Sequence, residues 1–192
     1  MRPISDNVPI DQRSAFLRVG LAAASLVIGL AASPMAAAVD IPMKLVTASG
    51  VGNSIGTVTA TDTANGLQLT PALTGLPPGE HGFHLHAKGS CEPGPDPDKG
   101  GAAAAAFGAG GHFDPAVTGK HEGPLGMGHQ GDIPYLVVSS DGRATKAVVA
   151  PRLKVSDLAG HALVIHVGGD NYSDQPTKLG GGGARIACGV AS

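Results

Sequence analysis

Aromatic side chains are scarce in this sequence: they make up 3% of the residues, and tryptophan is absent. Any core must therefore be filled by Val, Leu, Ile and Ala. An excess of one charge is also missing, because 13 Lys and Arg side chains stand against 15 Asp and Glu. That balance points to no nucleic-acid or membrane partner. Glycine and proline are plentiful, at 30 and 15 residues, and predict many turns and few long helices.

Several common catalytic signatures are missing as well. The chain has no Gly-x-Ser-x-Gly sequence, and His121-Glu122 is not followed by the second histidine of a zinc-protease helix. The glycine run from Gly180 to Gly183 lacks the Lys-Ser/Thr pair of a phosphate-binding loop. Asn171-Tyr172-Ser173 fits a glycosylation sequon, but so short a motif is a weak signal.

The first 38 residues have the pattern of a secretory signal peptide. Three arginines precede an apolar run from Leu21 to Ala32, and a small-residue segment ends at Ala38. The apolar run is shorter than the roughly 20 residues of a membrane-spanning helix. We therefore expect cleavage after Ala38, which leaves one domain over residues 39–192. An uncleaved anchor and a start codon later than Met1 are the alternatives.

Most of this domain has the pattern of short β-strands separated by turns. β-Branched or alternating segments occupy residues 43–48, 55–61, 67–73, 80–86, 135–139, 146–150, 162–167 and 185–190. Asn65-Gly66 and Asp141-Gly142 are typical of tight hairpin turns. No segment shows helical periodicity over ten residues. The pattern predicts an all-β domain, either a sandwich or a barrel.

One long segment interrupts the strands. From Lys88 to about Gly131 the chain is rich in Gly, Pro and Ala. A connection of this length is uncommon in a compact domain and is usually either functional or disordered. Within it, Ala102 to Ala106 indicates a short helical turn or filler, and the role of residues 93–106 is open. The possible metal ligands in the segment favour a function.

The histidines between residues 81 and 86 separate by strand parity. His84 and His86 are two residues apart, so both imidazoles lie on one face of a strand and can meet one ion. His81 is an odd number of residues from each of them and points to the other face. We therefore predict a hydrogen-bonded scaffold role for His81 and metal binding for the other two.

A second set of possible ligands lies in the long segment or at its end. It comprises His112, His121, His129 and Asp132. Three imidazoles and a carboxylate suit a tetrahedral zinc site, although isolated loop histidines are common on protein surfaces. His166 ends an apolar strand and by itself is typical of a core or edge histidine. Together these residues imply more than one metal, with copper or zinc at an all-imidazole site.

Two cysteines are present, Cys91 and Cys188. An even number of cysteines in an exported chain can form a disulfide bond. In the chain-entropy model, closing a loop of roughly 100 residues stabilises a protein by about 4.7 kcal/mol. Two buried free thiols are the alternative.

Several motifs, in the same order, resemble the copper/zinc superoxide dismutase family and its bacterial periplasmic branch in particular. The resemblance runs from about Val46 to Val190 and is carried by residues 81–86, 110–115, 119–124, 129–132, 166–171 and 183–189. It implies an eight-stranded Greek-key β-sandwich or barrel, immunoglobulin-like, with a long metal-binding loop. It also implies a periplasmic location and either a monomer or a homodimer.

The resemblance implies one copper and one zinc ion per subunit. Copper would be held by His84, His86, His112 and His166. Zinc would be held by His112, His121, His129 and Asp132, so that His112 bridges the two metals. Asp170 resembles a carboxylate that hydrogen-bonds one ligand of each metal. Arg185 resembles a guanidinium that attracts the anionic substrate, and Cys91 and Cys188 match an intrachain disulfide.

The implied activity is the disproportionation of superoxide to O2 and hydrogen peroxide. The copper would be reduced and reoxidised in alternation, with zinc in a structural role and His112 and Arg185 taking part in catalysis. Between Asp170 and Arg185 the chain carries few charges, so Lys120 or other loop charges are candidates for substrate steering. A copper-delivery protein on the same fold and a structural module are the alternatives, and metal analysis with a superoxide assay separates them.

Overall fold

The regular structure of the described residues consists of strands and short 3-10 helices. The computed structural model describes residues 38–191, so the predicted signal peptide falls outside the described residues except for Ala38. The strands are β1 Ala38–Thr47, β2 Gly50–Thr63, β3 Gly66–Leu73, β4 Gly79–His81, β5 Phe83–His86, β6 Gly94–Asp96, β7 Ala102–Ala104, β8 Leu136–Val138, β9 Val148–Ala150, β10 Ala162–His166 and β11 Arg185–Val190. The 3-10 helices are η1 Pro97–Lys99, η2 Phe107–Ala109, η3 Val155–Leu158 and η4 Lys178–Gly181. Within this part of the chain, no helix is long and apolar enough to cross a membrane.

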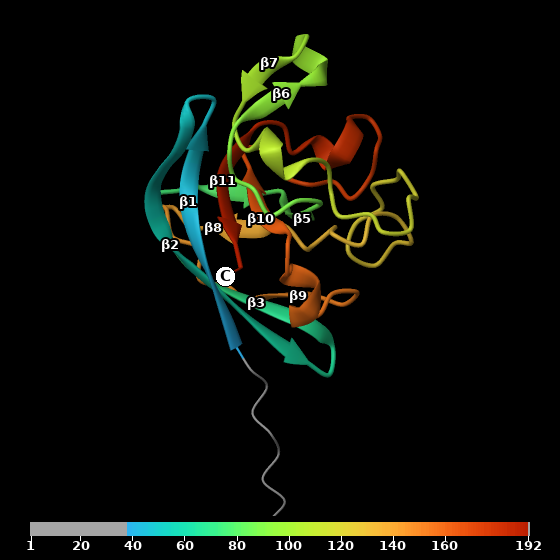
Figure 1. The fold of residues 1–192 in the computed structure, drawn as a ribbon. Helices are drawn as coiled ribbons and strands as arrows, with labels where there is room; N and C mark the ends of the chain where they lie inside the picture. Colours follow the sequence, from blue (N-terminus) through green and yellow to red (C-terminus); the bar gives the residue numbers. More distant parts are fainter. Residues whose placement is uncertain (1–37, 192) are drawn as a thin grey trace, which may run out of the picture. The chain divides into compact units, whose positions relative to one another are not determined.

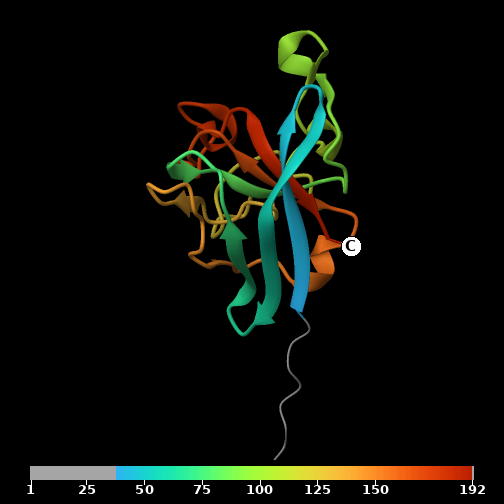
Figure 2. The ribbon, with the colours of Figure 1, turned by 90° about the vertical axis from the view of Figure 1, so that its left-hand side faces the viewer.

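Seven strands form one antiparallel sheet in the order β5-β10-β11-β1-β2-β3-β9. Figures 1 and 2 show this sheet curling strongly into a half-barrel, with the long β1–β2 hairpin running along one side. β4 pairs with β8, and the chain continues from β4 into β5 after Gly82. Neighbours such as β1 and β11 are far apart in sequence, which gives the crossovers of a Greek-key arrangement. The all-β prediction is confirmed.

The core consists mainly of aliphatic side chains, as the low aromatic content requires. Leu67 and Leu69 of β3 alternate with more exposed residues and are fully buried. Phe83 and Leu85 of β5 enter the same core, where each side chain contributes roughly 1.5–3 kcal/mol through burial. Because neighbouring residues of a strand face opposite sides, this anchoring turns the two histidines of β5 away from the core.

The long segment after β5 is partly regular. β6 pairs with β7 through Gly94 and Ala104, so residues 102–104 form a strand and neither of the two alternatives, a helical turn or filler, describes them. Alanine is the residue with the highest helix propensity, but a run this short does not offset the cost of starting a helix. Backbone pairing with β6 decides the structure instead. A disulfide between Cys91 and Cys188 joins the segment to β11, which excludes the free-thiol alternative. Figures 1 and 2 show the β6–β7 ribbon projecting near the β1–β2 turn.

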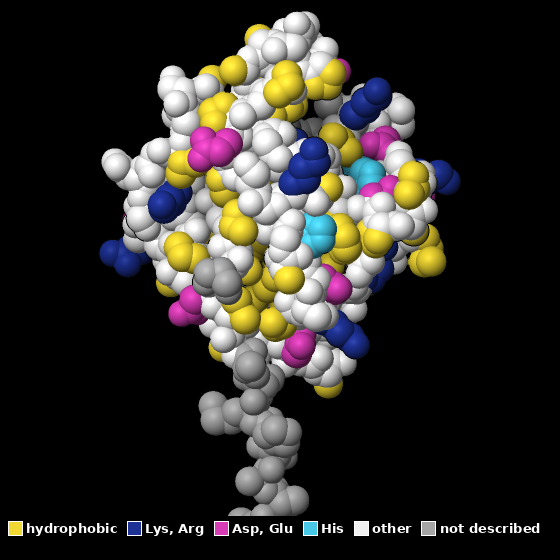
Figure 3. Space-filling model, viewed as in Figure 1, with side chains coloured by type: hydrophobic (Ala, Val, Ile, Leu, Met, Phe, Trp, Pro, Cys, Tyr) yellow, Lys and Arg dark blue, Asp and Glu magenta, His cyan; other side chains and the backbone are white. Residues whose placement is uncertain are grey.

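Charged side chains are dispersed over the face that Figure 3 draws. On the face drawn in Figure 3, Lys and Arg lie among acidic and apolar side chains, and no broad area carries one sign. Large apolar side chains that protrude fully are found in the irregular segment before β8, at Val117, Leu125 and Met127. This face therefore agrees with the balanced composition.

Candidate metal centre

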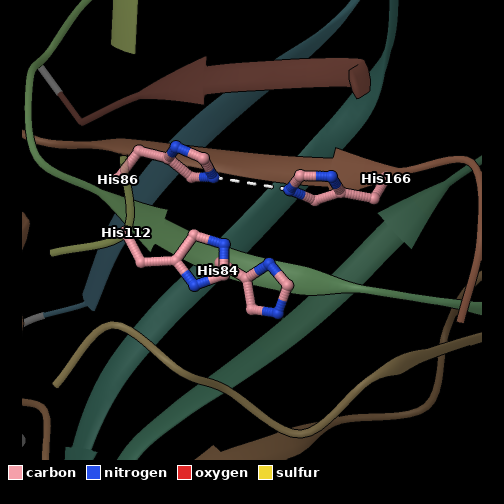
Figure 4. A group of neighbouring side chains, drawn as sticks. All are labelled: His84, His86, His112 and His166. Atoms are coloured by element: carbon pink, nitrogen blue, oxygen red, sulfur yellow. Dashed lines mark hydrogen bonds between the residues drawn. The ribbon is translucent and has the colours of Figure 1, made fainter. Parts of the chain in front are cut away.

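Four histidines from three parts of the chain converge beside β5 (Figure 4). His84 and His86 lie on β5, and His166 ends the neighbouring strand β10. His112 comes from the long segment and forms an isolated backbone bridge with His86. All four side chains are buried, and one ring nitrogen of each lies within 4.8 Å of the others. The structure thus brings together the four residues that were predicted as copper ligands.

Hydrogen bonds to backbone carbonyls fix the tautomers of two of these histidines. Nδ1–H of His86 donates to the Gly110 carbonyl over 2.9 Å, and Nδ1–H of His166 donates to the Gly183 carbonyl over 3.0 Å. A carbonyl oxygen only accepts, so the Nε2 atoms carry the lone pairs when the rings are neutral. These Nε2 atoms lie 3.4 Å apart (Figure 4). Two lone pairs this close repel each other unless a cation binds both.

Other ring nitrogens at the centre are buried without a hydrogen-bond partner. Among the described residues these are His84 Nδ1, His112 Nε2, His121 Nδ1 and His129 Nδ1. An unsatisfied buried polar atom costs about 1–3 kcal/mol, so four of them in one place indicate a site built for a ligand. Coordination by lone pairs satisfies all four atoms, and the donor set therefore fits bound metal.

A second group of four shares His112 with the first. Its members are His112, His121, His129 and Asp132, all buried, with ligand atoms within 4.8 Å of one another. The Asp132 carboxylate lies 2.9 Å from His112 Nδ1 and 3.0 Å from His121 Nδ1. His112 thus presents Nδ1 to this group, while its Nε2 faces the other. The mixed imidazole and carboxylate donors are those that zinc accepts.

Asp170 links the two groups, because its carboxylate hydrogen-bonds one histidine of each. Its Oδ2 accepts a hydrogen bond from His84 Nε2–H over 2.8 Å, and its Oδ1 accepts one from His121 Nε2–H, also over 2.8 Å. The backbone N–H of Tyr172 donates to the same carboxylate. These bonds leave the Nδ1 atoms of both histidines facing the centre, and a carboxylate partner of this kind orients a ligand and raises its basicity.

Burial keeps the first group of histidines in the neutral, ligating form. It lowers the pKa of His84, His86 and His166, and it lowers the pKa of His112 to about 3. His121 differs: burial opposes its charged form, but the nearby Asp132 carboxylate and the hydrogen bond with Asp170 outweigh burial and raise its pKa to about 9. The buried centre therefore combines neutral imidazoles with a carboxylate-rich end, where a cation is favoured.

Arg185 lies across from His166 in the register of β10 and β11. Its two terminal nitrogens donate to the carbonyls of Ala106 and Gly110, each over 2.7 Å, and its guanidinium lies 4.2 Å from the centre of the Phe107 ring. Burial lowers the pKa of Arg185 to about 10, so the side chain stays cationic at neutral pH. The Gly110 carbonyl thus accepts from Arg185 and also from His86.

A surface cavity of about 420 Å³ gives access to this centre. His86, His112, His166 and Arg185 line it, together with Phe107 and residues of η1 and η4. The cavity therefore presents the histidines and the guanidinium to the same space. The carbonyls of Gly110 and Gly183 were not recognised in the sequence, because backbone acceptors leave no signal in residue type.

His81 stays outside both groups, as strand parity predicts. Its Nδ1 lies 2.7 Å from the His166 carbonyl, and its Nε2 lies 2.8 Å from the Pro77 carbonyl. Neither nitrogen faces the ligand groups, so the residue serves the scaffold that holds His166.

Comparisons with known proteins agree with this geometry. The family model described as copper/zinc superoxide dismutase matches residues 54–191. The Cu-Zn superoxide dismutase of Escherichia coli K12 is 59% identical over 174 residues, which cover 90% of this chain and 98% of that protein. Cu-Zn superoxide dismutase 2 of Salmonella typhimurium LT2 is 60% identical over 160 residues, covering 83% and 91% of the two chains.

Solved structures of similar proteins have the same fold. The Cu/Zn superoxide dismutase from Brucella abortus superposes with a TM-score of 0.78 at 44% identity, covering 81% of this chain and 100% of that one. The solution structure of the monomeric copper, zinc enzyme from Salmonella enterica gives 0.72 at 60% identity, again over 81% and 100%. With the family model and close relatives both matching over most of its length, the chain belongs to the copper/zinc superoxide dismutase family.

Proposed function

We propose that this protein is a superoxide dismutase that uses one copper and one zinc ion. The observation that carries the proposal is the pair of buried four-residue ligand groups that share His112. Family membership supports the same reaction. Copper bound at the all-imidazole group supplies the one-electron chemistry by which two superoxide anions and two protons become O2 and hydrogen peroxide.

We propose that the copper is held by the all-imidazole group, His84, His86, His112 and His166. Their free nitrogens are Nδ1 of His84 and Nε2 of the other three. The opposite ring nitrogens are hydrogen-bonded to Asp170, Gly110, Asp132 and Gly183, in the order His84, His86, His112 and His166. Imidazole nitrogens are ligands that copper accepts readily. The four side chains are buried, and the group is reached from solvent through the cavity that His86, His112 and His166 line.

We propose that the zinc is held by the second group, His112, His121, His129 and Asp132. This set is closed, with four protein ligands, which is typical of a structural zinc site. It keeps the loop and the shared imidazole in place. His112 Nε2 belongs to the copper group. When this nitrogen is not coordinating copper, its lone pair would be free to hold a proton and to give it up to peroxide.

Arg185 is proposed to attract superoxide and place it next to the copper group. Arg185→Gln removes the cation at the inner end of the cavity, and we expect the superoxide-consumption rate at low salt to fall about 10-fold or more. Pulse radiolysis over a range of ionic strengths measures this, with metal content checked in each preparation. Arg143→Gln, which changes an arginine in an exposed turn, should leave the rate unchanged. An unaltered rate in the Arg185 variant contradicts the anion-guiding role.

Metal reconstitution tests the proposal as a whole. The metal-free protein should be inactive, should take up one zinc and one copper per chain, and should consume superoxide only after copper is added. Zinc binding without copper binding, or binding of both metals without activity, would favour the non-catalytic metal-binding reading instead.

We also propose that residues 1–38 are a signal peptide and that the domain acts in the periplasm. The disulfide supports an oxidising compartment. The similar enzyme from Salmonella enterica is described as monomeric, and a monomer is proposed for this chain in preference to a homodimer.

A further inference from the structure

The loop that carries three of the proposed zinc ligands, His121, His129 and Asp132, closes on itself without a regular helix or strand. The backbone N–H of His129 donates to the Lys120 carbonyl over 2.8 Å. At Gly128, an added Cβ would lie 2.2 Å from that same carbonyl oxygen, so only glycine permits the close approach. This loop, residues 120–132, needs partners outside itself for the carbonyls that its irregular path leaves exposed.

Arg152 supplies those partners. One terminal nitrogen donates to the Gly128 carbonyl over 2.9 Å, and the other donates to the His129 carbonyl and, over 3.4 Å, to the Gly123 carbonyl. A loop residue also donates to the arginine: the side-chain amide of Gln130 donates to the Arg152 carbonyl over 3.0 Å. Side chain and main chain of Arg152 are therefore both bound to the loop.

The backbone on either side of Arg152 is anchored in the core. Arg152 lies just beyond β9, whose Ala150 pairs with Leu67 of β3. Ala150 and Leu153, on either side of the arginine, are buried with 1% of their surface exposed. A guanidinium held by this anchored backbone fixes the position of the carbonyls that it contacts.

The contacts of Arg152 are specific to the loop. Within residues 38–191, no carboxylate lies at ion-pair distance from it, and its Nε is buried without a hydrogen-bond partner. Burying part of a guanidinium is unfavourable unless its donors are used. Here both terminal nitrogens are directed at one short stretch of backbone, which indicates that the charge serves the geometry of that stretch.

We propose that Arg152 is a positioning residue for the zinc site. By holding the carbonyls of residues 123, 128 and 129, it keeps His129 facing Asp132 and His121 before metal arrives. Preorganised ligands bind more tightly because less conformational entropy is lost on binding. The inference rests on the proposed zinc site, and it adds a residue that contacts no ligand atom directly.

Zinc affinity, measured by competition with a chromophoric chelator, tests the proposal. Arg152→Ala should weaken zinc binding about 10- to 100-fold, the range typical of lost partners behind a metal ligand. Copper binding to the zinc-loaded protein should change far less. Arg143→Ala, which removes a guanidinium that is 63% exposed, is the matched control and should bind zinc like the unaltered protein.

Two further measurements separate positioning from a general loss of stability. Cobalt in the zinc site should show altered visible bands in Arg152→Ala, and methylguanidinium added at millimolar concentration should partly restore both the bands and the affinity. Arg152→Lys keeps the charge but has one terminal donor nitrogen in place of two. It should bind zinc with intermediate affinity, and it tests the proposal if the alanine variant does not fold.

Unchanged zinc affinity in both Arg152 variants, or an equal loss of zinc and copper affinity, would overturn the positioning role. Failure of the unaltered protein to bind zinc would instead overturn the proposed function, so the two failures are distinct.

Discussion

Replacement of His86 by glutamine should remove copper binding and lower superoxide consumption about 100-fold or more, while zinc binding persists. His86 belongs to the all-imidazole group alone, and its Nε2 faces that of His166 at 3.4 Å. Removing a group that hydrogen-bonds a metal ligand typically lowers metal affinity or activity 10- to 100-fold. Removing the ligand itself should lower them at least as much. Metal analysis after dialysis, together with a superoxide assay, measures both effects.

His161→Gln is the matched control for this change. His161 contacts the carbonyls of His86 and Ala87 but belongs to neither ligand group. Its replacement should therefore leave copper content and activity close to those of the unaltered protein. Retention of copper by the His86 variant would refute the assignment of the ligand, and loss of both metals together would show that the two sites do not bind separately.

The second large effect is expected from the disulfide. Changing both Cys91 and Cys188 to serine should lower the free energy of unfolding by about 2–5 kcal/mol, since the bond spans 97 residues and restricts the unfolded chain. The bond also fixes the segment that brings the carbonyls of Ala106 and Gly110 to Arg185. Activity at low salt should therefore fall as well, even where the variant is folded.

Urea denaturation of metal-free protein measures the change in stability. The unaltered protein should lose a similar amount when it is reduced, whereas the double serine variant should be insensitive to reductant. Equal unfolding free energies for the oxidised protein and the variant would mean that the bond does not stabilise the native state.

Much of the fold could be predicted from alternation and turn residues. β3 and β11 coincide closely with their predicted ranges, because long alternating segments and Asn-Gly turns are decided locally. β6 and β7 could not be predicted, since their sequence of Gly, Pro and Ala has no pattern and their pairing depends on tertiary context. Strand parity at residues 84 and 86 gave the side of the sheet on which the metal centre lies.

The remainder of the site depends on contacts that residue types do not reveal. Spacing alone gave no reason to join His166 to His86, which meet only through the pairing of β5 and β10. The roles of Asp170 and Arg185 came from the family resemblance, and the contacts of Arg152 came from the structure. Each of these depends on backbone carbonyls or on strand register, and both are invisible until the chain is folded.

Gly110 adopts a backbone conformation that restricts which residue can occupy its position. Its backbone has φ 74° and ψ −157°, a region open essentially to glycine, yet an added Cβ would meet nothing closer than 3.7 Å. The neighbours leave space for a methyl group, but an L-amino acid rarely adopts this φ and ψ because its Cβ clashes with its own backbone. The Gly110 carbonyl, which accepts from both His86 and Arg185, is therefore held by a backbone conformation that depends on glycine. Enlarging the surrounding cavity would not make that conformation accessible to another residue.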